Sequence, residues 1–206
     1  MTTWWFVYLN RPMSAWSSFN MQFEVSVFPQ NFSGLVLLSN PQVETCWDKV
    51  VMVIIKHSQE TGTIGLQLNR PSRLNLSDFN DKNWESFGDI PVFLGGPSQM
   101  QKLMITAFDW HREQQLIKWR LGLSPKQAYQ LVCDYPAMNF RAYCGHISWQ
   151  SGQLEEELKN KIWLPIPVPQ KKLFAPHPQN LWQDLMSQFY PLGLFFKQLP
   201  TNPSLN

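Results

Sequence analysis

The chain has 206 residues, a net charge of +2, and charged side chains at only 16% of its positions. This length suits one domain with a sizeable core. The absence of a concentrated basic run argues against nucleic acid as a partner. The apolar runs in "MTTWWFVYL" (1–9) and "VVMVII" (50–55) are too short for a secretion signal or a membrane span. The three cysteines have no CxxC spacing, which favours free thiols in a reducing compartment. We therefore expect a cytoplasmic protein without a membrane partner.

The N-terminal region differs from the rest of the chain. Residues 1–33 are aromatic and polar without clear periodicity, except that "QFEVSVF" (22–28) alternates like a strand. We expect 1–33 to be an extension, with Met13 or Met21 as alternative translation starts. Residues 34–196 would then form the domain, and 197–206 a flexible C-terminal tail.

Strand patterns begin at Gly34. "GLVLL" (34–38) predicts a strand, and "KVVMVIIKH" (49–57) predicts a buried one, because its apolar run is continuous and β-branched. "TIGLQLN" (63–69) alternates after a short turn, which indicates an antiparallel hairpin partner. Pro71 ends that strand, since proline cannot donate to a β-ladder.

The middle of the chain predicts a second hairpin. Residues 72–89 form a polar connection with one helical turn near 76–79. "IPVFLGGP" (90–97) predicts a strand that enters a glycine turn. "KLMITAF" (102–108) and "QLIKW" (115–119) alternate on either side of a polar loop, which indicates two paired strands.

Three helices are predicted in the second half. Ser124, Pro125 and Gln127 have the spacing of a capping box with proline at the first helical position. A strand at 140–147 follows. A second helix begins after Ser151, where the glutamates at 155–157 favour the positive end of the helix dipole.

The chain closes with a strand and an amphipathic helix. "IWLPIPV" (162–168) predicts an edge strand because of its prolines, and the apolar stripe of residues 181–189 predicts the helix. Strands outnumber helices and mix hairpins with longer crossovers, so we expect the α+β class.

Two patterns have both a chemical and a structural interpretation. Gly95 and Gly96 could cradle a phosphate, but the following proline removes a donor, which favours a tight turn. Cys144 and His146 are two apart on a predicted strand, hence on one face, and a Cys–His pair can activate a thiolate. A metal site from these two with His57 lacks the closely spaced ligand pairs of structural zinc, so we expect no metal and no catalytic residue.

Polar residues at strand ends offer a further candidate site. His57, Asn69 and Arg70 could bind an anion or a carboxylate. Alternatively, Asn69 and Arg70 bind loop carbonyls, as such side chains commonly do. The glutamates at 155–157 could supply a carboxylate dyad, although a solvated helix start explains them more simply.

Taken together, these segments resemble the YqgE/AlgH family of bacterial proteins. The resemblance covers roughly residues 34–190 and rests on ordered landmarks: "GLVLL" (34–38), "VVMVIIKHSQETGTIGLQLNRP" (50–71), "PVFLGGP" (91–97), "GHISWQSGQLEEEL" (145–158) and "WLPIPV" (163–168). The chain departs from the family pattern at several places: Ser98 stands where valine is common, His146 replaces a usual tyrosine, and Ser148 and Gln150 replace glycines.

The resemblance implies a single α+β domain with a bent mixed or antiparallel sheet that closes into a pseudo-barrel, flanked by helices. It implies no established enzymatic activity and no cofactor, and some members are labelled transcriptional regulators. Our leading hypothesis is a non-enzymatic binding or regulatory module for an unidentified small ligand or protein. Its groove would be lined by residues of the three central landmarks: His57, Asn69, Arg70, Gly95, Gly96, Trp149, Gln153 and Glu155. The alternatives are a hydrolase or transferase acting on a small anionic metabolite, and a transcription-linked regulator without a recognisable DNA-binding motif.

Overall fold

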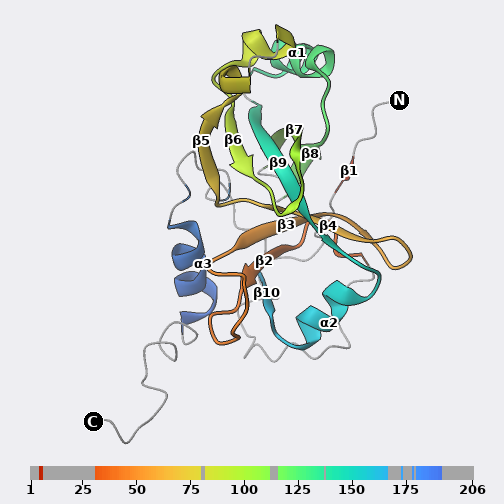
Figure 1. Cartoon of the computed structure of the whole chain (residues 1–206), viewed down its shortest axis with the longest axis vertical. Coiled ribbons are helices and arrows are strands. Elements are labelled where there is room, and N and C mark those ends of the chain that lie inside the picture. Colours follow the sequence, from red (N-terminus) through yellow and green to blue (C-terminus); the bar gives the residue numbers. More distant parts are fainter. Residues whose placement is uncertain are drawn as a thin grey trace, which may run out of the picture.

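The computed structural model describes residues 5–6, 31–79, 82–111, 116–136, 138–166, 173, 178 and 180–191. Within these ranges ten strands form one mixed sheet (Figure 1). The strands are β1 (Trp5–Phe6), β2 (Val36–Ser39), β3 (Val51–Ser58), β4 (Gly62–Gln67), β5 (Pro71–Asn75), β6 (Pro91–Leu94), β7 (Ser98–His111), β8 (Leu116–Arg120), β9 (Asn139–Trp149) and β10 (Trp163–Ile166). The helices are η3 (Leu76–Phe79), η4 (Lys82–Phe87), α1 (Pro125–Asp134), α2 (Gln153–Lys159) and α3 (Leu181–Phe189).

The long strand β9 joins the two halves of the sheet. Its first part pairs with β7 and, in parallel, with β6, and its last part pairs antiparallel with β4. The strand order is β1-β8-β7-β9-β4-β3-β2-β10, with β6 and β5 branching from β9. The α+β class and the bent mixed sheet are therefore confirmed. The expected pseudo-barrel is wrong, because the described strand pairings close no ring.

The edge strand β10 has features that hinder pairing with a further strand. β10 pairs only with β2 among the described strands, as the prolines of the segment 162–168 predict. Pro165 has no N–H to donate, and its carbonyl accepts a hydrogen bond of 2.6 Å from the Tyr190 hydroxyl. These two residues leave this edge poorly suited to accept a closing strand.

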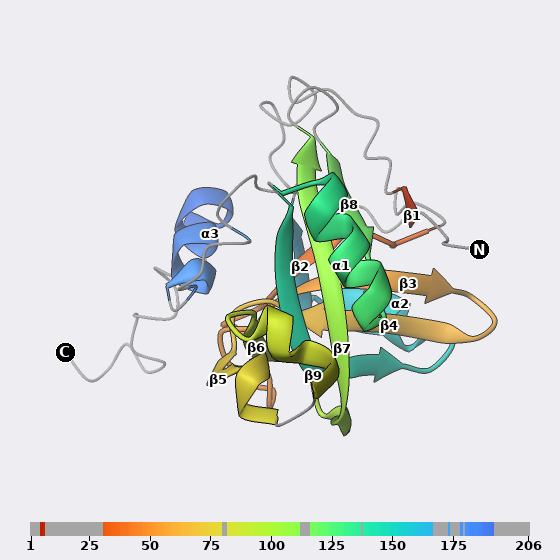
Figure 2. The same ribbon diagram turned by 90° about the horizontal axis from the view of Figure 1, so that it is seen from above.

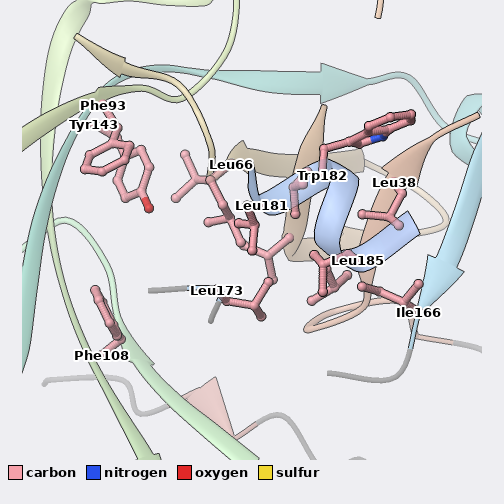
Figure 3. Close-up of a cluster of buried hydrophobic side chains, with 14 of the residues drawn as sticks. Leu38, Leu66, Phe93, Phe108, Tyr143, Ile166, Leu173, Leu181, Trp182 and Leu185 are labelled. Atoms are coloured by element: carbon pink, nitrogen blue, oxygen red, sulfur yellow. The ribbon is translucent and has the colours of Figure 1, made fainter. Parts of the chain in front are cut away.

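Three apolar clusters stabilise the fold, and each includes one α-helix. In the first, α3 packs on β2, β3 and β4 (Figure 3), and the Trp182 indole donates to the Ser39 carbonyl at 3.1 Å. In the second, α2 packs on the opposite face of β2 and β3, together with the end of β9 and with β10. In the third, α1 packs with η3 and η4 on β6, β7 and β9. In both views α1 lies beside the η helices, opposite the α2 end of the molecule in Figure 1 and facing the viewer in Figure 2.

Gly145 allows side chains of β9 to contribute to two different apolar clusters. Tyr143 belongs to the first cluster and Ile147 to the second, although residues four apart on a regular strand share a face. Gly145 lies between them with φ +72°, a left-handed conformation that interrupts the alternation.

Most predicted elements are confirmed. β3 and β4 form the first hairpin, β7 and β8 the second, and Ser124 with Gln127 forms the capping box of α1. The connection 72–89 contains the expected turn, η3, but also η4 and the strand β5, which lacks an apolar pattern because it is exposed. The strand expected at 22–28 and the tail at 197–206 lie outside the described residues, and the domain boundaries stay predictions. No helix among the described residues is long and apolar enough to cross a bilayer.

Candidate functional site

A β-bulge in β3 brings His57 to the α2 side of the sheet. The β3–β4 register pairs Ile54 with Gly65 and His57 with Thr63, so one extra residue of β3 lies between these pairs. Without this extra residue, Lys56 and not His57 would lie on the α2 side of the sheet. Thr63 in turn pairs with Trp149 of β9, so His57, Thr63 and Trp149 share one rung.

The His57 imidazole is enclosed on three sides. Its side chain is 3% exposed, its Nδ1 lies 2.8 Å from Thr63 Oγ1, and its ring centroid is 4.5 Å from that of Phe32. Its Nε2 lies 3.6 Å from a carboxylate oxygen of Glu155. Hydroxyl, imidazole and carboxylate follow one another as in a catalytic triad. However, a nucleophile has to reach its substrate, and Thr63 is only 2% exposed.

The Glu157 carboxylate organises the neighbouring tryptophans. One oxygen accepts the indole N–H groups of Trp149 at 2.9 Å and Trp163 at 2.6 Å, and the other accepts the Gln153 amide at 2.9 Å. Gln153 also accepts the backbone N–H of Gln150 at 3.0 Å. Of these two predicted site residues, Trp149 therefore joins α2 to the sheet through Glu157, and Gln153 joins the helix to the loop at Gln150.

Two glycines make room for Trp149. A Cβ on Gly65 would lie 3.0 Å from the indole, and one on Gly62 would lie 2.2 Å from the Trp149 carbonyl oxygen. Landmark glycines and tryptophan in separate segments are thus parts of one packing arrangement.

Asn69 and Arg70 lie at the other end of β3. Asn69 accepts the Val51 N–H at 3.0 Å and donates to the Lys49 carbonyl at 2.7 Å, while Arg70 donates to the Asp48 carbonyl at 2.8 Å. These bonds fix the loop before β3, the structural alternative considered above.

The predicted site residues therefore divide into separate groups. Val51 and His57 are six residues apart on β3, on the order of 20 Å at strand spacing. A pocket for one small ligand does not span that distance. The structure brings His57, Trp149, Gln153 and Glu155 together but places Asn69 and Arg70 elsewhere.

Gly95 and Gly96 cross β9 at close range. A Cβ on Gly95 would lie 2.3 Å from the Gly145 carbonyl oxygen, and one on Gly96 2.3 Å from the His146 carbonyl carbon. The Gly95 N–H donates to the Cys144 carbonyl at 2.8 Å. Close packing of two backbones requires these glycines.

Cys144 and His146 lie near the same crossing. Burial raises the pKa of the Cys144 thiol, and burial followed by the charge of Lys102 lowers the pKa of His146. Both shifts oppose a thiolate–imidazolium pair. Ser98 pairs with His146 in the β7–β9 register, and its hydroxyl lies 2.8 Å from that of Ser148, so three departures from the family pattern adjoin one another.

Arg141 is a buried residue that sequence reasoning missed. It is 2% exposed, lies with its guanidinium 4.3 Å from the centroid of Phe93, and donates to the carbonyls of Leu68 and Leu173 at 3.4 Å. A single arginine within an apolar strand carried no distinguishing pattern. No group of three or more potential metal ligands occurs among the described residues.

Exposed apolar side chains concentrate in one half of the molecule. Among the residues with described side chains, the large hydrophobic residues that are well exposed belong to β5, β6, β7, η3 and α1 or its C-cap: Leu74, Phe79, Leu94, Met100, Tyr129, Val132 and Tyr135. We call the exposed apolar side chains of η3 and of α1 with its C-cap, namely Phe79, Tyr129, Val132 and Tyr135, the apical face. Tyr129 is 60% exposed and Tyr135 50%. Sequence reasoning missed this face because the same helix also has a buried stripe.

Comparison with known proteins identifies related chains of similar length. A family model described as AlgH-like matches residues 36–191. A UPF0301 protein of Streptomyces avermitilis is 25% identical over 191 residues, covering 85% of this chain and 96% of the relative. A UPF0301 protein of Rickettsia canadensis is 29% identical over 166 residues, covering 76% and 87%.

Two solved structures share the fold. Protein DIP2367 from Corynebacterium diphtheriae aligns with a TM-score of 0.61 and 26% identity, covering 81% of this chain and 92% of that one. The AlgH protein from Pseudomonas aeruginosa aligns with a TM-score of 0.56 and 20% identity, covering 85% and 98%. The second likeness shows the fold alone.

Proposed function

The chain belongs to the AlgH-like family, and we propose that it is a non-enzymatic protein-binding module whose partner docks on the apical face. The observation that carries the proposal is the exposure of Phe79, Tyr129, Val132 and Tyr135 on η3 and around α1. Exposed apolar groups gathered in one region mark interaction sites more often than scattered ones do. Tyrosine is also enriched in protein interfaces.

Hydrogen bonds within the protein support protein binding over small-ligand binding, because they engage polar side chains of the landmarks. Trp149, Gln153, Asn69 and Arg70 each donate one hydrogen bond to an acceptor of the protein itself. Such groups maintain the fold and leave little for a small ligand. The raised pKa of Cys144 likewise argues against nucleophilic catalysis. The described cysteines are free, which supports a cytoplasmic location.

Site-specific photo-crosslinking tests the proposal. A benzophenone amino acid replaces Tyr129 in one variant and Lys159, an exposed residue of α2, in the control. In the cells that make the protein, we expect a discrete adduct from position 129 and none from position 159. Equal adducts from both positions, or none from position 129, would remove the proposal.

A further inference from the structure

We propose that the partner on the apical face is a second copy of this chain, with the two α1 helices packed antiparallel. This inference rests on the proposed function and names its partner. The evidence is the distribution of charge and apolar surface along α1.

The outer face of α1 is continuous and exposed. Residues at helical spacing opposite the buried Ala128 and Leu131 form it: Lys126, Tyr129, Gln130, Cys133 and Asp134. Tyr129 is its large apolar side chain, and the exposed Val132 follows one helical turn later.

The two charges of this face stand at its opposite ends. Lys126 lies in the first turn of α1 and Asp134 in the last. Asp134 accepts hydrogen bonds from Gln130 at 3.2 and 3.4 Å and lies within electrostatic range of Arg120. Neither Lys126 nor Asp134 forms a salt bridge with another described residue.

A partner that matches this face presents the same charges in reverse order. An antiparallel copy of α1 does so, because a two-fold axis near Gln130 places each Lys126 against the other copy's Asp134. The same axis pairs the two helix dipoles head to tail. It also brings the two Tyr129 rings to the centre, where aromatic residues contribute most to binding.

Charge reversal tests this pairing. We expect Lys126→Glu and Asp134→Lys each to weaken the dimer about tenfold, since two exposed ion pairs are lost and replaced by repulsion. The double variant Lys126→Glu/Asp134→Lys should restore the wild-type dissociation constant, measured by sedimentation equilibrium. A double variant no tighter than either single variant would overturn the proposal. So would a wild-type chain that stays monomeric at millimolar concentration.

Crosslinking of single-cysteine variants provides an independent measurement. Cys133 is three residues from the axis. The Cys133 positions of the two chains are therefore separated by about 9 Å along the helix direction, and the helices lie about 8–10 Å apart. With Cys46 and Cys144 replaced, a short bis-maleimide should join two Cys133 thiols. The matched control keeps only Cys46, which is exposed on the loop before β3. Equal dimer yields from both variants would contradict the antiparallel pairing.

The outcomes separate the two proposals. If the purified chain is monomeric while position 129 crosslinks to a different protein in cells, the self-association is wrong and the protein-binding function stands. If neither experiment gives an adduct from the apical face, both are wrong.

Discussion

The Glu157 carboxylate accepts the indole N–H groups of Trp149 and Trp163 through one oxygen, at 2.9 and 2.6 Å. Trp149 is 5% exposed and Trp163 1%. A single surface helix thereby satisfies two donors that are otherwise out of reach of water.

Removal of this carboxylate should destabilise the fold. Glu157→Ala leaves two buried N–H groups without an acceptor, at about 1–3 kcal/mol each. We expect a loss of roughly 2–6 kcal/mol in the free energy of urea unfolding. Glu156→Ala is the control, because Glu156 is exposed on the same helix, and should change stability by less than about 0.5 kcal/mol. Similar losses in the two variants would refute the role of Glu157.

Two glycines with similar φ angles test the strand crossing. Gly145 and Gly122 have φ +72° and +63°, but a Cβ on Gly145 would lie 2.3 Å from the Gly96 carbonyl oxygen, whereas one on Gly122 meets nothing within 4 Å. Both alanine variants incur the same left-handed strain. We expect Gly145→Ala to cost at least about 2 kcal/mol more in unfolding free energy, because the backbones must separate. Equal costs would mean that conformation alone selects glycine here.

The cysteines should differ in reactivity. Burial raises the pKa of Cys144, so less of it is thiolate at neutral pH, whereas Cys46 and Cys133 are exposed. Mass spectrometry of iodoacetamide-treated protein should show Cys144 alkylated last in the native state and at a similar rate to the others in urea. If Cys144 reacts first, the enzyme alternative gains support.

His146 should make stability depend on pH. Its pKa is lowered in the folded state, first by burial and then by Lys102, from an ordinary value of 6.5. Below that value the unfolded chain binds a proton more readily than the folded chain does. The His146 contribution to stability is therefore present above pH 6.5 and is lost as the pH falls toward the folded pKa.

Unfolding of His146→Asn at two pH values measures this contribution. Between pH 7.5 and pH 5 the wild type should lose more stability than His146→Asn. The same comparison can be made with Lys102→Gln present in both chains. The difference in lost stability between the chains with His146 and with His146→Asn should then be smaller. Parallel losses in wild type and His146→Asn would show that the imidazole titrates alike in both states.

The sequence predicted much of the fold because its local signals agree. The capping box of Ser124 and Gln127 and the alternation in β4 each specify an element independently of the rest of the chain. β5 was missed because its residues are mostly exposed. The open sheet was missed because closure depends on which strands meet, and no periodicity encodes that.

The candidate site was harder to predict. His57 is buried only because a bulge shifts the register of β3 by one residue, and the sequence pattern contains no sign of that shift. Glu157 was expected to support the helix start, yet it binds tryptophans of two separate strands. Asn69 was expected either to bind a ligand or to bind loop carbonyls, and its amide donates to the Lys49 carbonyl.

Under the proposed function, binding takes place at the apical face and not at the landmark residues. The most direct test places the photo-crosslinking amino acid at Val132 and compares adduct yield with and without Tyr129→Asp. Tyr129 is 60% exposed, so the substitution should leave the unfolding free energy within about 0.5 kcal/mol of its original value. We predict that Tyr129→Asp abolishes the adduct while stability is maintained. An undiminished adduct would contradict the claim.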